Sequence, residues 1–392
     1  MQIRQRVALE NAALGRHNYF SGSLVRTFTR KRESQRILVT GGAGYIGSKL
    51  LPKLLNGGYK VRLLDRLFFT TQPISNVINH PNLELIRSDF RYVEKVVECL
   101  RGVDSVIHLG AIDGHSACVL NEDLAIETNY VATRNIAEIA EASGVKRFVF
   151  ASSCAVYGAS KSDEILGEES KLNPVSLYAI TKAESERVLL DLAGPQFSPV
   201  CLRFPTLYGL SGRMRFDSEV NLLAARAVVE GQLVVQDCDK WRSFLHVDDA
   251  VISILKSLEA PLDKVHGEIF NVGSNEQNFM IQQIGEMIKE RIPTTELINL
   301  SIGDDHRDYK ANFNKIRERL DFIPQWSIEQ GIEQVIRLIK SGNVSDYQAP
   351  QYSNVRFLTQ EGASRLVRGE TNWAHDLMTQ TIPEEFPFVQ AA

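Results

Sequence analysis

The chain has 392 residues, of which 44% are hydrophobic and 23% are charged, as expected for a globular protein with a large apolar core. Lys and Arg number 44 and Asp and Glu number 48, so the net charge of −4 argues against nucleic acid as the main partner. No apolar run reaches the roughly 18 residues of a membrane-spanning helix. The five cysteines include no C-x-x-C pair, which argues against a disulfide framework or a zinc site and favours a reducing, cytoplasmic compartment.

The first 36 residues form a basic segment. They contain eight Lys or Arg residues against only Glu10 and Glu33, so the remaining chain is acidic. An Arg-rich, acid-poor start is typical of an organelle transit peptide, but also of an extension that packs on the body or on a neighbouring subunit. We favour the second interpretation and treat 1–35 as a basic N-terminal extension.

Short β-branched runs then alternate with helical stretches as far as residue 204. The predicted strands are 37–39, 60–64, 83–86, 105–109, 147–151 and 200–203. The predicted helices are one ending at Leu55, 121–142 and 176–192. Such alternation is typical of right-handed crossovers in an α/β fold, so we expect a Rossmann-type doubly wound parallel sheet over 36–204.

The alternation of strands and helices becomes less regular after residue 204. Amphipathic helices are predicted at 218–230, 279–291 and 327–340, with short strands between them. We expect 205–340 to form mainly a smaller C-terminal substrate-binding lobe, with parts of 233–272 returning to the sheet domain. Residues 341–392 show little periodicity and are interpreted as a C-terminal extension.

A glycine-rich turn, Thr40 to Gly47, joins the first predicted strand to the first helix. Its G-x-x-G-x-x-G spacing lets the backbone turn tightly and brings a diphosphate to the positive end of a helix. A P-loop needs Gly-Lys-Ser/Thr, whereas this chain has the reversed order Gly47-Ser48-Lys49, which argues against an NTPase. The turn therefore predicts a dinucleotide site.

Asp65 ends the second predicted strand, 18 residues after Gly47. A carboxylate there accepts hydrogen bonds from both ribose hydroxyls of the adenosine half and repels a 2′-phosphate, which favours NAD over NADP. The alternative is that Asp65 is a turn or cap residue. Arg66 follows directly and is suited to stacking on adenine or, less favourably, to accepting a 2′-phosphate.

Tyr178 and Lys182 lie one helical turn apart on one helix face. A tyrosine has an ordinary pKa of about 10, and a cation held nearby favours its phenolate, so the pair predicts a general base near neutral pH. Ser152 and Ser153 end the preceding strand, where ligands of parallel sheets bind. A surface helix that carries this spacing by chance is the alternative.

Five ordered motifs together resemble the extended short-chain dehydrogenases/reductases, specifically the NAD-dependent sugar-nucleotide epimerase/dehydratase group. The resemblance spans about residues 36–340. The motifs are the glycine turn, Ser152–Gly158, Tyr178-x-x-x-Lys182, Leu202-Arg203-Phe204 and Arg242–Asp249.

By position, the resemblance implies that Ser153 is the catalytic hydroxyl, Tyr178 the general acid/base and Lys182 its partner. It implies that Asp89 and Phe90 line adenine and that the family's structural asparagine is Asn129. The full set of implied NAD-binding residues is Gly41, Gly44, Tyr45, Ile46, Asp65, Arg66, Asp89, Phe90, Leu109, Ala111, Asn129, Ser152, Tyr178, Lys182 and Pro205.

The implied substrate is a nucleotide sugar, whose diphosphate suits the planar fork of arginine. The implied substrate-binding residues are Ser153, Thr206, Asn221, Arg242 and Arg307, with Thr206 in place of the commoner asparagine. We expect His246 to be structural, and the family resemblance implies a homodimer.

The residues before Val156 reduce the number of reactions that the sequence supports. Similar dehydratases carry an Asp-Glu pair there and similar decarboxylases a glutamate, whereas this chain has Cys154-Ala155, which disfavours both reactions. A 4-epimerase needs only Ser153, Tyr178, Lys182 and NAD, and we favour it. We interpret Cys154 as a buried structural residue, although an acid/base role stays open.

Asp113 and His115 are further candidates for contact with substrate. A net oxidoreductase acting on a keto-sugar or another small carbonyl compound remains the main alternative function. A nucleotide-sensing protein without catalysis is the third possibility, against which the intact Ser-Tyr-Lys set argues.

Overall fold

The computed structural model describes residues 35–159, 164–301 and 307–362. The predicted extension 1–35 lies almost wholly outside these residues, as does the end of the C-terminal extension from 363 onward. Among the described residues, no helix is both long and apolar enough to cross a membrane.

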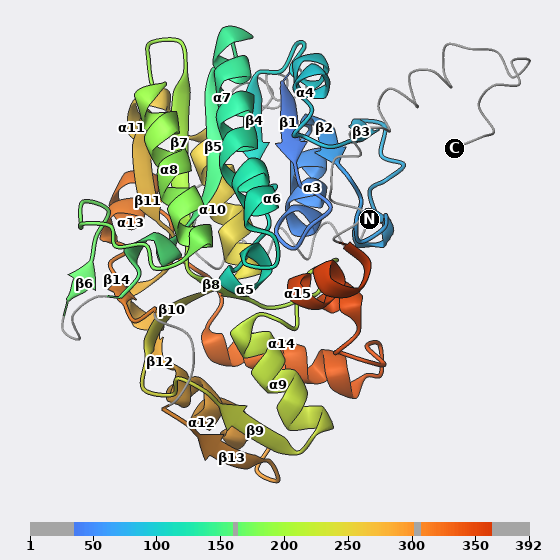
Figure 1. Cartoon of the computed structure of the whole chain (residues 1–392), viewed down its shortest axis with the longest axis vertical. Coiled ribbons are helices and arrows are strands. Elements are labelled where there is room, and N and C mark those ends of the chain that lie inside the picture. Colours follow the sequence, from blue (N-terminus) through green and yellow to red (C-terminus); the bar gives the residue numbers. More distant parts are fainter. Residues whose placement is uncertain (1–34, 160–163, 302–306, 363–392) are drawn as a thin grey trace, which may run out of the picture.

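A seven-stranded parallel sheet forms the upper body in Figure 1. It confirms the predicted α/β class, and each end of the predicted strands falls within two residues of the observed one. In spatial order the strands are β11 (Glu268–Asn271), β7 (Ser198–Phe204), β5 (Arg147–Ser153), β4 (Ser105–His108), β1 (Arg36–Thr40), β2 (Lys60–Asp65) and β3 (Leu83–Arg87).

Apolar helices cover both faces of this sheet. Because strand side chains alternate, Ile37 and Val39 of β1 pack into one core and Leu38 into the other. The first core is covered by α3 (Gly47–Asn56) and α10 (Val247–Glu259). The second is covered by α4 (Val93–Cys99), α7 (Ala132–Ala142) and α8 (Leu177–Asp191).

The predicted helix over 121–142 is not a continuous α-helix. It consists of α6 (Glu122–Ile126), a π-helical turn over Glu127–Val131 and then α7. The short α5 (His115–Cys118) precedes it. Asn129 in the π turn bonds both backbone polar groups of Ile112, so this turn fastens the loop after β4.

The smaller lobe lies below the carboxyl edge of the sheet in Figure 1. Its core packs the predicted helices α9 (Glu219–Val229), α12 (Ile281–Arg291) and α14 (Ile328–Lys340). Its strands are β8 (Thr206–Tyr208), β9 (Gln232–Val235), β10 (Trp241–His246), β12 (Asn278–Met280) and β13 (Glu296–Asn299). Within 233–272, α10 packs on the sheet and β11 pairs with β7 as its edge strand.

Short elements complete the described chain. They are η1 (Gln72–Ile74), η3 (Cys154–Tyr157), β6 (Ile165–Leu166), α11 (Leu262–Val265), η4 (Asn275–Gln277), β14 (Lys310–Ala311), α13 (Asn314–Leu320), η5 (Pro350–Tyr352), α15 (Asn354–Phe357) and η6 (Leu358–Gly362). Of these, α15 matters most for function, because it folds back to lie between the lobe and α5 (Figure 1).

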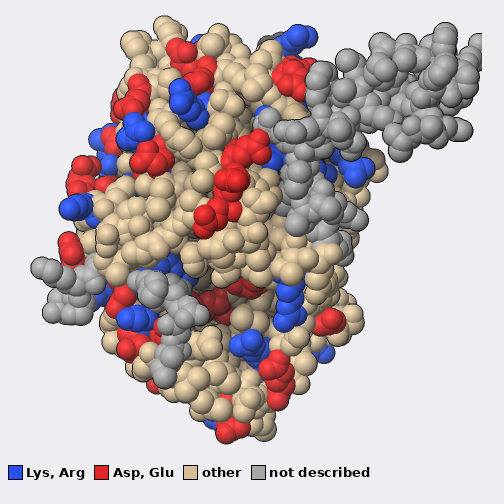
Figure 2. All heavy atoms as spheres, viewed as in Figure 1, with Lys and Arg blue, Asp and Glu red and all other residues tan. Residues whose placement is uncertain are grey.

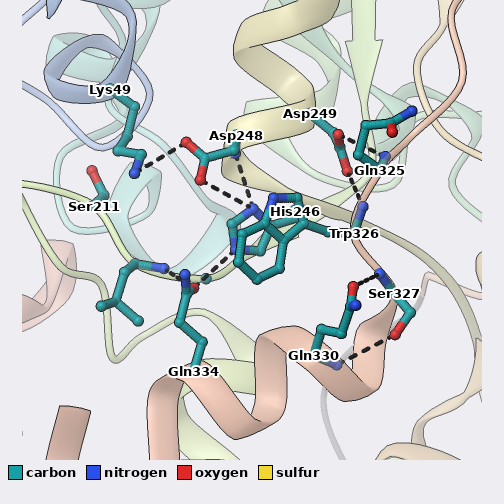
Figure 3. A network of polar contacts seen from close by, with 12 residues as sticks. Lys49, Ser211, His246, Asp248, Asp249, Gln325, Trp326, Ser327, Gln330 and Gln334 are labelled. Carbon is teal, nitrogen blue, oxygen red and sulfur yellow. Dashed lines mark hydrogen bonds and ion pairs between the residues drawn. The ribbon is translucent and has the colours of Figure 1, made fainter. Parts of the chain in front are cut away.

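A polar network around His246 joins the two parts (Figure 3). The imidazole stacks on Trp326 with ring centroids 4.1 Å apart, and its Nε2 lies 2.9 Å from the amide oxygen of Gln334 in α14. Its Nδ1 accepts the backbone N–H of Asp248, whose carboxylate pairs with Lys49 of α3. These contacts support the structural role expected for His246.

Candidate active site

A cleft of about 810 Å³ runs between the carboxyl edge of the sheet and the lobe. Figure 2 shows the surface hollowed between these two parts. Ligands of open parallel sheets bind at this edge, and the volume lies toward the upper end of the usual range for ligand pockets. Seventeen of the predicted site residues line the cleft: Gly41, Gly44, Tyr45, Ile46, Asp65, Arg66, Asp89, Phe90, Leu109, Ala111, Ser152, Ser153, Tyr178, Lys182, Pro205, Thr206 and Arg307.

The glycine turn folds as its spacing predicts. Gly41 has a φ of +70°, and a side chain there would meet the backbone of Gly110 at 2.5 Å. A side chain on Gly47 would meet the backbone of Gly42 at 2.3 Å, so α3 begins directly against the turn. The N–H of Ser48 donates to the carbonyl of Gly44 at 3.0 Å, and Gly47 lines the cleft, so the positive end of α3 lies at the cleft.

Asp65 ends β2 at the floor of this turn. One carboxylate oxygen accepts the N–H of Ala43 at 2.9 Å and the other accepts that of Leu67 at 2.7 Å. Burial raises the pKa of this carboxyl, and the two backbone bonds oppose the rise. A carboxylate has about four acceptor positions, so Asp65 retains capacity for ribose hydroxyls.

Ion pairs hold the neighbouring residues on the adenosine side. The carboxylate of Asp89 lies 2.7 Å from Arg66 and 2.7 Å from the buried Arg91. Burial by itself raises the pKa of Asp89, but the bonds to Arg91 outweigh this effect, so the pKa is lowered overall. Phe90 packs edge-on against His108, so its ring forms part of the cleft wall.

The predicted catalytic residues converge in the cleft. Ser153 ends β5 and Tyr178 is in the first turn of α8, and the two hydroxyls share a hydrogen bond. Lys182 is buried one helical turn further along, donates to the carbonyl of Ala151 at 2.7 Å and lies 5.8 Å from the Tyr178 ring centroid. Burial lowers the pKa of Lys182 to about 8.

The electrostatics of Tyr178 differ from the expectation. The sequence predicted that Lys182 would lower the phenol pKa, but burial and the neighbouring Asp113 raise it well above 10. Asp113 is also hydrogen-bonded to the phenol. Because Asp113 comes from the loop after β4, its charge on Tyr178 depends on tertiary structure that the spacing Tyr178-x-x-x-Lys182 does not reveal.

Sequence reasoning underestimated the importance of Asp113. Its carboxylate pairs with Arg215, which in turn lies 2.9 Å from Asp217. Burial by itself raises the pKa of Asp113. The charge of Arg215 and further polar contacts outweigh this effect and lower the pKa to about 2. An ionised carboxylate, a phenol and a serine hydroxyl therefore form one hydrogen-bonded chain. His115 lines the same cleft.

Three predicted site residues lie behind the wall of the cleft rather than on it. Asn129 bonds the backbone of Ile112, as described above. Asn221 is fully buried and bonds the backbone of Gly209 and Arg215. Arg242, also fully buried, donates to the carbonyls of Trp241 and Arg307. In this structure these side chains hold the loops that form the wall, and their contact with cofactor or substrate stays a prediction.

The residues on either side of Ser153, which are Ser152 and Cys154, both form hydrogen bonds with buried groups. The Ser152 hydroxyl donates to the carboxylate of Glu186, which forms a buried ion pair with Arg203. Cys154 is fully buried and its thiol donates to the carbonyl of Arg203 at 3.3 Å. Burial raises the pKa of Cys154, which makes its thiol a poor proton donor or acceptor.

A sequence model described as "NAD dependent epimerase/dehydratase family" matches residues 37–273. The chain belongs to this family. NAD is therefore its cofactor, and the site fits that group: Asp65 has spare acceptor positions at the ribose end, the glycine turn cannot accommodate side chains, and the buried Arg213 carries unpartnered donors in the cleft.

Relatives of known name are similar over most of their length. UDP-N-acetyl-alpha-D-glucosaminuronate decarboxylase of Bacillus cytotoxicus is 28% identical over 319 residues, covering 77% of this chain and 97% of its own. UDP-glucose 4-epimerase of Bacillus subtilis is 31% identical over 265 residues, covering 61% and 77%. This family member therefore resembles both decarboxylases and epimerases.

A solved structure supports the same fold. UDP-glucuronic acid 4-epimerase from Bacillus cereus, in complex with UDP-glucuronic acid and NAD, is 25% identical with a TM-score of 0.68. The similarity covers 78% of this chain and 99% of that one, so this chain carries additional residues with no counterpart there.

Proposed function

We propose that the protein is an NAD-dependent epimerase of a nucleotide-activated sugar, and that it inverts C4 through transient oxidation to a bound keto-sugar. One observation carries this proposal: Ser153, Tyr178 and Lys182 line one cleft with Ser153 bonded to Tyr178, while the positions that carry acids in similar dehydratases and decarboxylases hold Cys154 and Ala155. Ala155 has no ionisable group, and Cys154 is buried away from the cleft.

The chain's own residues would manage the proton. Tyr178 takes the proton of the sugar hydroxyl as the keto group forms, and Ser153 donates a hydrogen bond to the same oxygen. Lys182 stabilises the phenolate by its charge and is placed to hold the nicotinamide ribose. NAD, when bound, supplies reversible acceptance of a hydride and a positive charge that favours the phenolate.

Formation of the Tyr178 phenolate depends on the charge of Asp113. In the cleft as described, its ionised carboxylate opposes loss of the phenol proton. The base therefore forms only when positive charge in the cleft outweighs Asp113. This arrangement would keep Tyr178 protonated until the positively charged nicotinamide of NAD is in place.

The cleft also supports an anionic nucleotide sugar as substrate. Arg215 and Arg307 line it on the lobe side, and a guanidinium matches diphosphate or carboxylate oxygens through paired hydrogen bonds. The named relatives act on UDP-sugars, which makes UDP-hexoses and UDP-uronates the first compounds to test.

The test is incubation of the purified protein with UDP-glucose, UDP-galactose and UDP-glucuronate, followed by separation of the products. An epimerase gives an isomer of unchanged mass, with no lasting reduced nicotinamide. Loss of CO₂ or of water would replace the proposal with a decarboxylase or dehydratase. Net production or consumption of NADH would favour the oxidoreductase alternative.

Cofactor content gives an independent check. An epimerase regenerates its cofactor in each turnover and can keep it bound, whereas a net oxidoreductase must exchange it. We expect mass analysis of protein denatured without added cofactor to release about one NAD per chain. A protein purified without NAD, together with NADH turnover in solution, would overturn the epimerase proposal.

A further inference from the structure

Arg213 is a buried cation in the cleft without a hydrogen-bonded partner in the described parts of the chain. Its side chain lines the cleft, is 5% exposed, and its Nε and Nη2 atoms are both buried and unpartnered. Burial and the adjacent Arg215 lower its pKa to about 9. Burying a charge with unsatisfied donors is costly unless a bound anion compensates, so this side chain indicates an anion site.

The loop that carries Arg213 is fastened to the glycine turn. The hydroxyl of Ser211 donates to the carbonyl of Tyr45 and lies 2.7 Å from the hydroxyl of Ser48. The phenol of Tyr45 donates in return to the carbonyl of Gly209 at 2.7 Å. Arg213 is therefore held close to the first turn of α3, where the positive end of the helix favours a diphosphate.

The guanidinium also lies next to the adenosine side. It stacks on the ring of Phe69, 3.8 Å from the ring centroid, and Phe69 follows four residues after Asp65. The diphosphate of a dinucleotide links the ribose at Asp65 to the half that reaches Tyr178. Arg213 lies between the segment that binds that ribose and the turn that binds the diphosphate.

The C-terminal segment also packs against Phe69. Phe357 of α15 is 4% exposed, and its ring centroid lies 4.6 Å from that of Phe69 and 6.0 Å from that of Phe68. The three side chains Arg213, Phe69 and Phe357 therefore pack in succession. Residues 354–358 fall outside the segment 37–273 that the family model matches.

Polar contacts fix α15 across the cleft. The backbone N–H of Asn354 donates to the carboxylate of Asp217 at 2.7 Å, and its side-chain amide donates to the carbonyl of Asp113 at 3.1 Å. The N–H of Phe216 donates to the carbonyl of Tyr352 at 2.9 Å. The segment thus joins the loop of Arg213 to the loop after β4.

We propose that Arg213 binds the diphosphate of NAD. We further propose that α15, through Phe357 and Phe69, holds the Arg213 guanidinium in the position that contacts the cofactor. A guanidinium suits the task because its fork pairs with two phosphate oxygens at once. The consequence is that retention of NAD depends on a C-terminal segment distant in sequence from the glycine turn.

The test measures loss of NAD from the purified holoenzyme, by exchange against isotopically labelled NAD. Arg213→Met keeps the apolar stem and removes the charge, and we expect NAD to leave roughly 10 to 100 times faster, as for loss of a charged hydrogen bond. Phe357→Ala should give a smaller acceleration, and its effect should largely disappear in the Arg213→Met background because the two act as a unit. Arg356→Met, an exposed arginine on the same helix, is the control and should leave the exchange rate unchanged.

Two further measurements separate the possible outcomes. Arg213→Met should raise the melting temperature without NAD, because an unpaired buried charge is removed, and lower it with saturating NAD. Unchanged NAD exchange with weaker binding of UDP, measured calorimetrically, would assign Arg213 to the substrate diphosphate and overturn the proposal. Unchanged NAD exchange and unchanged UDP binding would show a packing role only and would also overturn it.

Discussion

Replacing Asp113 with Asn tests the electrostatic balance at Tyr178 most directly. The change removes the negative charge hydrogen-bonded to the phenol while keeping the size of the side chain. It also leaves Arg215 paired only with Asp217. Both effects favour the phenolate, so the pKa of Tyr178 must fall.

The magnitude follows from Coulomb's law. A carboxylate about 4 Å from a phenolate oxygen costs about 4 kcal/mol at an effective dielectric constant of about 20, which corresponds to about 3 pKa units. Arg215 on the same carboxylate cancels part of this field. We therefore expect the pKa of Tyr178 to fall in Asp113→Asn by part, and not all, of this Coulomb energy.

Two assays read this shift. A base acts in its deprotonated form, so the rise of kcat with pH should move to lower pH by the same amount. Near-ultraviolet titration of tyrosinate should show it too, once the spectrum of Asp113→Asn/Tyr178→Phe is subtracted. Asp217→Asn is the matched control, because Asp217 shares Arg215 but is not a described influence on Tyr178. Superimposable pH profiles for Asp113→Asn and the parent would refute the reasoning.

Three further predictions concern the cofactor, the base and the core. Asp65→Asn should weaken NAD binding and relax exclusion of NADP, measured by titration with both; equal affinities to the parent would make Asp65 a turn residue only. Tyr178→Phe should retain NAD but lose roughly 10² to 10⁴ in turnover on the true substrate, and near-normal turnover would remove the base. Glu186→Gln leaves Arg203 charged in the core, so the free energy of unfolding, from urea titration, should fall by about 3 to 5 kcal/mol; an unchanged value would contradict this.

Local patterns were sufficient to predict the sheet and the cofactor turn. The β-branched run before Gly41 and the glycine spacing after it act over a few residues, since strand alternation and tight turns are properties of neighbouring residues. For the same reason helix α8 was predicted within a residue at each end, and Tyr178 and Lys182 were correctly placed on one helix.

The predicted helix over 121–142 shows the limit of periodicity. Its apolar spacing is helical throughout, yet the structure inserts a π-helical turn at 127–131. The turn contains Asn129, whose side chain satisfies both backbone groups of Ile112 in the loop after β4. That requirement arises from a distant loop, so helical periodicity could not reveal it.

The electrostatics of the site were decided only by the tertiary structure. Burial and the charge of Asp113, which comes from the loop after β4, reverse the expected direction of the Tyr178 pKa. Asp113 is in turn held by Arg215 and Asn354, which lie 102 and 241 residues further along the chain. Asn221 and Arg242, for which the family resemblance implied substrate contact, are fully buried behind the cleft wall. A sequence determines which side chains neighbour one another along an element, but long-range packing determines which charges face one buried hydroxyl, and burial strengthens every such charge.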